Sequence, residues 1–178
     1  VNPVTGTLGV DDTLTLSTSG GSGTGAITFD VGSSTACTVS GTTLTGVAAT
    51  GSCEVTATKA EDDSYVAASS DPVTVTVGKG SQQTLIVAPL VGTLGVDDTL
   101  TLSTSGGSGT GAITFDVGSS TACSVSGSTL TGVAASGSCE VTVTKAEDDS
   151  YYAATSSALS ISVGKGTQAP LTVDAIVG

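Results

Sequence analysis

The sequence contains no arginine, histidine, methionine or tryptophan, and it has only two phenylalanines and three tyrosines. Four lysines stand against 16 acidic residues, so the formal net charge is −12. Binding to nucleic acid or to anionic lipid needs a basic surface, so we expect neither nucleic acid nor a membrane as a direct partner. Without histidine, no imidazole can activate a serine or cysteine, and we therefore expect no enzyme and no resident cofactor.

Apolar residues make up 38% of the chain, more than disordered segments contain. They alternate with polar residues, and this period of two predicts strands that are covered on one face. Turns rich in glycine and aspartate separate the strands. The strands expected in the first repeat are 2–8, 13–19, 26–31, 37–40, 43–47, 53–59 and 72–77. This number of short strands in so small a unit predicts an all-β fold, an immunoglobulin-like (Ig-like) β-sandwich.

The chain consists of a repeat. Thr7–Gly80 and Thr93–Gly166 align at an offset of 86 residues and differ at 12 of 74 positions. Repetition at this period predicts tandem domains. The expected organisation is one Ig-like domain at residues 1–80, a second at 81–166, and the first strand of a third repeat at 167–178.

Each repeat contains one pair of cysteines with the same spacing, Cys37 with Cys53 and Cys123 with Cys139. We expect one disulfide in each domain, because two thiols without histidine cannot complete a zinc site. Closing a loop of this length should stabilise a small domain by about 3 kcal/mol. Disulfides form in oxidising compartments, so we expect the protein to be extracellular or on a cell surface.

The glycine-rich segment 21–29, the run Ala36–Gly41, the run Gly51–Ala60 and the closing valine–threonine strand together resemble the Ig-like tandem repeats of very large bacterial secreted and surface proteins. This resemblance implies a mechanical role, as a semi-rigid stalk of an adhesin or as a self-assembling fibre subunit. The implied partners are neighbouring repeats and other copies of the chain. The alternative, from another functional class, is a module that binds calcium or a glycan at its inter-domain loops.

The C-terminal segment repeats the join between the two domains, whereas the equivalent of Ser81–Ile86 is missing ahead of residue 1. Two interpretations are open. The chain can be a piece cut from a longer array. Alternatively, the segment can pair with the open sheet edge of a neighbouring chain, through Leu171, Val173 and Ile176.

Two acidic clusters suggest a calcium site. In an Ig-like sandwich the first turn and the last loop lie at opposite poles, so Asp11 and Asp12 would face Glu147, Asp148 and Asp149 across the join. Converging carboxylates are suitable calcium ligands. The alternative interpretation is that these are solvated turn residues, since aspartate is common in turns.

The tyrosines offer the only platform for a sugar. Tyr65 and Tyr151 occupy the same position in the two repeats, so we expect their rings to close one end of each sandwich. Tyr152 replaces Val66 of the first repeat. It is therefore the candidate glycan-binding residue.

Overall fold

A computed structural model describes residues 6–89 and 92–173 of the chain. The chain divides into two compact units. The first unit holds the chain up to Gln83 together with Ser108–Gly111 and Glu147–Ala153. The second unit holds Thr84–Gly107, Ala112–Ala146 and the chain from Ala154 onward. Two loops that the repeat assigns to the second domain thus belong to the first compact unit.

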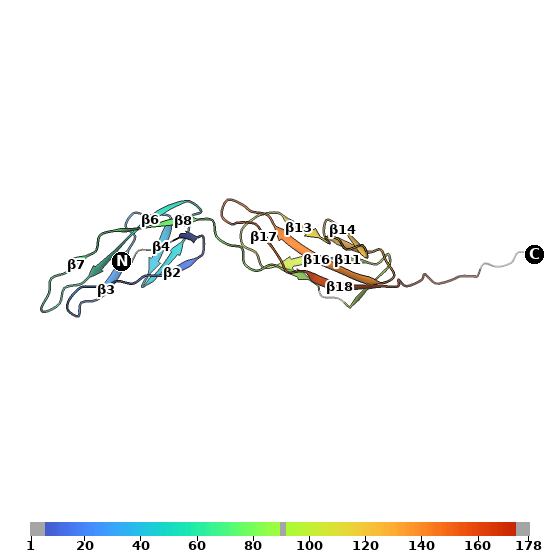
Figure 1. The fold of residues 1–178 in the computed structure, drawn as a ribbon, viewed down its shortest axis with the longest axis horizontal. Coiled ribbons are helices and arrows are strands. Elements are labelled where there is room, and N and C mark those ends of the chain that lie inside the picture. The colour runs from blue at the N-terminus through green and yellow to red at the C-terminus, as the bar shows by residue number, and fades with distance from the viewer. Residues whose placement is uncertain (1–5, 90–91, 174–178) are drawn as a thin grey trace, which may run out of the picture. The chain divides into compact units, whose positions relative to one another are not determined.

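The first repeat forms two sheets, one with the strand order β1-β8-β6-β3 and the short β7 beside β6, the other with the order β2-β5-β4 (Figure 1). The strands are β1 Thr7–Gly9, β2 Thr13–Thr15, β3 Ile27–Asp30, β4 Cys37–Ser40, β5 Thr43–Gly46, β6 Gly51–Lys59, β7 Ala68–Ser69 and β8 Val73–Gly78.

The second repeat has the same two sheets, β10-β18-β16-β13 with β17 beside β16, and β11-β15-β14. Its described residues also contain a strand pair formed by β9 and β12. The strands are β9 Ile86–Ala88, β10 Thr93–Gly95, β11 Thr99–Thr101, β12 Ser103–Ser105, β13 Ile113–Asp116, β14 Cys123–Ser126, β15 Thr129–Gly132, β16 Gly137–Lys145, β17 Ala154–Thr155 and β18 Leu159–Gly164.

The fold prediction is confirmed: every regular element of the described residues is a strand, and each repeat is an Ig-like sandwich. The third and sixth of the predicted strands are antiparallel neighbours in the structure, β3 with β6, in the register Ile27↔Lys59 to Asp30↔Thr56. Within residues 6–89 and 92–173, no helix is long and apolar enough to cross a membrane.

Some strand bounds differ from the sequence prediction. The strand expected at 13–19 ends at Thr15 in the first repeat, whereas its equivalent in the second repeat resumes as β12 (Ser103–Ser105). The antiparallel pairing of β12 with β9 holds this extension in the second repeat. The described part of the expected third-repeat strand, residues 167–173, belongs to no sheet.

The cores are aliphatic, as the scarcity of aromatic residues requires. Leu44, Val55 and Val75 are almost completely buried in the first repeat. Leu130 and Ile161 are completely buried in the second. Along each strand, buried side chains alternate with more exposed ones. Each sheet therefore has one apolar face, and these two faces pack against each other.

The structure contains the two disulfides expected from the sequence, Cys37–Cys53 and Cys123–Cys139. Their Cα atoms are 6.2 and 5.9 Å apart. Cys37 begins β4 and Cys53 lies in β6, so this bond joins the two sheets of the sandwich. All four cysteines are buried. Each bond is therefore part of a core.

Candidate functional site

The acidic loop Glu147–Ala153 is organised by Asp148. Its carboxylate accepts hydrogen bonds from four backbone N–H groups, those of Thr110 (2.5 Å), Ser150 (2.8 Å), Tyr151 (2.9 Å) and Gly111 (3.2 Å). Donation by Thr110 and then by Ser150 lowers the pKa of Asp148 from 3.8 to about 2, because these dipoles stabilise the charged form. The carboxylate is thus a structural acceptor that closes the loop.

Asp62 has the same role in the first repeat. It accepts from the backbone N–H groups of Ser64 and Tyr65, both at 2.9 Å, and of Thr24 at 2.5 Å. The hydrogen bonds from Ser64 and then Thr24 hold the pKa of Asp62 below its usual value. Asp62 and Asp148 thus accept equivalent backbone N–H groups in the two repeats. Each carboxylate has a structural role in its own loop.

We predict that ionisation of Asp148 can be followed as acid unfolds its loop. Its folded-state pKa is depressed, so its contribution to stability is fully present above pH 3.8 and is lost as the pH falls through about 2. Carboxyl-carbon NMR should give a midpoint of about 2 for Asp148, and the amide signal of Thr110 should move in the same titration. In Asp148→Asn the movement of the Thr110 signal should disappear. A midpoint near 3.8 in the unmodified chain would contradict the assignment.

Asp11 accepts a hydrogen bond within the first compact unit. The Tyr151 hydroxyl, in a side chain that is 9% exposed, donates to Oδ2 of Asp11. This bond to the carboxylate raises the pKa of Tyr151, because it stabilises the protonated phenol. Gly80 lies beside this ring, donating its N–H to the Ser150 carbonyl (2.9 Å) and accepting the Tyr152 N–H (3.0 Å).

The five predicted calcium ligands do not form a metal cluster in the described structure. No group of three or more His, Cys, Asp or Glu side chains in residues 6–89 and 92–173 is placed to hold an ion. Asp11 and Asp148 accept the hydrogen bonds given above, and Asp12 lies in a turn in which its N–H donates to Gly9. Glu147 is 3.8 Å from Lys79 in a partly exposed ion pair, which contributes little to stability. Asp149 is exposed. Calcium binding by these loops stays a prediction.

The tyrosines differ from expectation in one case. Tyr151 is buried as predicted, but Tyr65 is 53% exposed and therefore does not close its end of the sandwich. The Tyr65 ring packs near Gly23, and the Tyr151 ring packs near Gly109. Tyr151 has additional contacts with Gly80 and Asp11. Tyr152 is 56% exposed, and glycan binding there stays a prediction.

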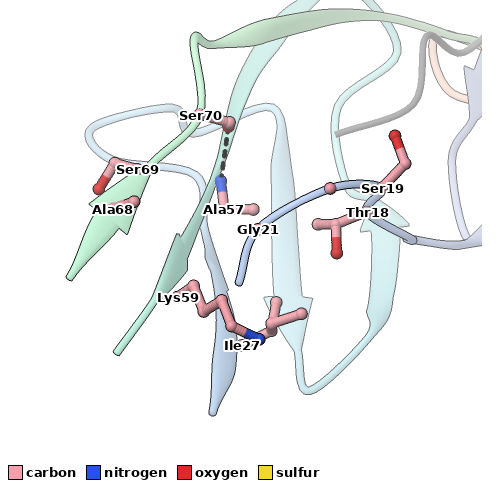
Figure 2. Close-up of a pocket in the computed structure, with 10 residues that line it drawn as sticks. Thr18, Ser19, Gly21, Ile27, Ala57, Lys59, Ala68, Ser69 and Ser70 are labelled. Atoms are coloured by element: carbon pink, nitrogen blue, oxygen red, sulfur yellow. Dashed lines mark hydrogen bonds between the residues drawn. The ribbon is translucent and has the colours of Figure 1, made fainter. Parts of the chain in front are cut away.

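The residues predicted for strand exchange are accessible where they are described. Leu171 is 94% exposed and Val173 is 98% exposed. Ile176 lies outside the described residues. The first repeat has a hollow lined by Thr18–Gly21, Ile27, Ala57, Lys59 and Ala68–Ser70 (Figure 2). Strand exchange through Leu171, Val173 and Ile176 stays a prediction.

No family model matches this chain. No curated protein matches it either. Among solved structures, the S-layer protein rSbsC (residues 31–844) is similar with a TM-score of 0.37 and 16% identity over 82% of this chain. This chain spans only 21% of that structure's length. Fibronectin(III)-like modules of Clostridium thermocellum CbhA are similar with a TM-score of 0.32 and 15% identity, over 89% of this chain and 86% of theirs. Both TM-scores are below 0.5, so neither likeness bears on function.

Proposed function

We propose that this chain is a structural repeat of a long extracellular protein, in which each sandwich bears load between its two ends as part of a stalk. The observation that carries the proposal is the parallel pairing of the first and last strands of each repeat. β1 pairs with β8 from Thr7↔Thr76 to Gly9↔Gly78. β10 pairs with β18 in the equivalent register.

Parallel pairing determines how force reaches the hydrogen bonds. A pull on the two ends of a repeat draws β1 and β8 in opposite directions along their common axis. All hydrogen bonds between the two strands are then loaded together, whereas strands that are pulled apart from one end break theirs one after another. Simultaneous loading needs more force, which is the property that a stalk between a surface and its target requires.

Two other features support an extracellular stalk. The disulfides are buried bonds that join the two sheets of each sandwich, and such bonds persist in oxidising surroundings. The net charge of −12 keeps crowded copies soluble through mutual repulsion. Neither feature requires a catalytic group or a bound ligand.

Force spectroscopy on the 178-residue chain, held by its two ends, tests this role. We expect two unfolding events, one for each repeat, and we expect Val10→Pro to lower the unfolding force of the first repeat only. Val10 donates its N–H to the Gly78 carbonyl at 3.1 Å, and proline removes that donor. The lost hydrogen bond alone should cost about 1 kcal/mol.

Two controls define the result. Val10→Ala keeps the N–H and should retain more of the force than Val10→Pro, and Val96→Pro should weaken the second repeat instead, since Val96 donates to Gly164 at 3.1 Å. Reduction should lengthen each event by roughly 50 Å, because the cysteines are separated by 16 residues of about 3.4 Å each. Equal forces for the alanine and proline variants, or unfolding without a resolved force peak, would contradict a load-bearing role.

A further inference from the structure

The second repeat has an open hollow at one edge of its sandwich. In the described structure, β13 is the last strand of one sheet and β14 is the last strand of the other (Figure 1). The hollow has a volume of about 410 Å³ and is lined by Ile113, Thr114 and Phe115 of β13 and by Gly127 and Ser128 in the turn after β14. Ligand sites in proteins have volumes of roughly 300–1,000 Å³, so the size of this hollow is suitable for a ligand.

The backbone of β13 directs hydrogen-bonding groups toward this edge. β13 and β16 are antiparallel, in a register that places Ile113 opposite Lys145. One step earlier, the N–H of Ala146 donates to the Ala112 carbonyl at 2.8 Å. Hydrogen-bonded and non-hydrogen-bonded pairs alternate along an antiparallel ladder, so Ile113 and Phe115 direct their N–H and C=O groups away from β16. These groups form a template for an added strand.

The side chains beside this template are apolar. Ile113 is 37% exposed, and Phe115 is partly buried against the core. A residue placed opposite either of them would project its side chain to the same face, into the hollow. Gly127 leaves space at the far wall, because among the described residues no heavy atom beyond its chain neighbours lies within 4 Å of a Cβ atom built there. The hollow therefore suits two apolar side chains that are two residues apart in an extended peptide.

The charge at this edge is negative. Asp116 ends β13 and is exposed, and only its Oδ1 accepts a printed hydrogen bond, from the Gly118 N–H at 2.6 Å. Lys145, opposite Ile113, lies with its side chain against Gly107 and is not part of the described lining of the hollow. A second copy of the chain would bring its own net charge of −12 to this carboxylate. The charge therefore favours a basic partner over a second copy.

The first repeat has the same edge. β3 and β13 share the sequence Ile-Thr-Phe-Asp, and β3 is also the last strand of its sheet in the described structure. The N–H of Ala60 donates to the Ala26 carbonyl at 2.8 Å, so Ile27 and Phe29 direct their backbone groups away from β6. Ile27 is 43% exposed. A partner with two suitable segments would therefore gain avidity from the two edges of one chain.

We propose that the edges of β13 and β3 dock extended, basic segments of other proteins by strand addition. On β13, the segment runs antiparallel and places apolar residues opposite Ile113 and Phe115, where their side chains fill the hollow. Basic residues stand opposite Thr114 and Asp116, on the outer face of the sheet. The basic residue opposite Asp116 lies beside its carboxylate.

This docking is independent of the load-bearing role proposed above. Binding is measured without force, and the force experiment is carried out without a partner. Either proposal can therefore fail while the other succeeds.

Amide NMR of the 178-residue chain, titrated with the end-blocked peptide Lys-Val-Lys-Val-Lys, tests the proposal. We expect the amide signals of Ile113 and Phe115 to move most, because their N–H groups gain an acceptor. The signals of Ile27 and Phe29 should move in the same way. The Thr114 signal should move less, because its N–H is directed toward β16. No movement at millimolar peptide, or movement centred elsewhere, would overturn the proposal.

Two matched peptides separate strand addition from simple attraction between charges. Methylation of both valine nitrogens keeps the charge of the peptide but removes the N–H groups that pair with the edge, so it should abolish the shifts. Glu-Val-Glu-Val-Glu keeps the pairing groups but reverses the charge, and it should bind far more weakly. If the methylated peptide binds like its parent, strand addition is wrong. If the glutamate peptide does, the preference for a basic partner is wrong.

Ile113→Lys, with Val133→Lys as its matched control, tests the hollow. Val133 is 49% exposed and is not part of the described lining. Ile113→Lys should weaken binding at β13 about tenfold, since it removes apolar contact and adds a like charge. It should leave the response of Phe29 intact, and Val133→Lys should leave both edges intact. Both positions are exposed, so the melting temperature of each variant should be unchanged. Equal weakening by the two variants would overturn the assignment of the site.

Sedimentation velocity without peptide distinguishes a foreign partner from a second copy. We expect Ile113→Lys to leave the distribution of species unchanged, because the acidic edges of two copies repel each other. Dimers of the unmodified chain that disappear in Ile113→Lys would mean that β13 pairs with a second copy, and would overturn the proposal.

Discussion

Removal of either disulfide is expected to lower the melting temperature of its own repeat by roughly 12–24 °C. The chain-entropy model assigns about 3 kcal/mol to a loop of this length. For a domain of this size, each kcal/mol corresponds to about 4–8 °C. The effect is large because Cys37 and Cys53 are buried and join the two sheets of a small, mainly aliphatic core. The measurement is thermal unfolding of Cys37→Ala/Cys53→Ala, followed by the amide NMR signals of β6 for the first repeat and of β16 for the second.

The repeat supplies a matched control for this experiment. Cys123→Ala/Cys139→Ala should shift the signals of β16 and leave those of β6 in place. Chemical reduction of the unmodified chain should shift both sets. A shift of less than about 5 °C in the melting temperature of the affected repeat would mean that the two sheets are held together without the bond. The disulfide would then contribute little to stability.

Leu85→Ala is expected to destabilise the second repeat by about 2–5 kcal/mol, the range for truncating a buried leucine. Leu85 is 4% exposed and packs on Gly107 in the core of that repeat. Its loss should leave a cavity in that core. Urea unfolding, again followed by the signals of β16, should show a lower midpoint.

Leu171→Ala is the matched control, because Leu171 has the same place in the repeat and is 94% exposed. It should change the free energy of unfolding, obtained from urea titration, by less than about 0.5 kcal/mol, as exposed substitutions do. If Leu85→Ala were equally harmless, the packing of Leu85 on Gly107 would contribute nothing to the stability of the second repeat.

The fold was largely predictable because its signals are local. Alternation in residues 27–31 and 73–77 placed β3 and β8 almost at their observed bounds. The equal spacing of Cys37–Cys53 and Cys123–Cys139 predicted both disulfides. These patterns depend on neighbouring residues or on the repeat period, and both can be read along the chain.

The candidate sites were less predictable because they depend on contacts between distant segments. Asp148 belongs to an acidic run that suggests a metal ligand, but it accepts backbone N–H groups from Thr110 and Gly111, more than 35 residues earlier. Charge alone does not distinguish a carboxylate that awaits a cation from one that is already satisfied. The distinction lies in the donors that the fold brings to it.

By itself, the sequence determined the all-β class, the two sandwiches and the two disulfides. Only the tertiary structure decided which side chains of an identical local sequence are covered. Tyr65 and Tyr151 follow identical residues, yet one is 53% exposed and the other 9%. The reason is that Tyr151 contacts Gly80 and Asp11, which lie far away in the sequence, and the residues of its own loop do not encode those contacts.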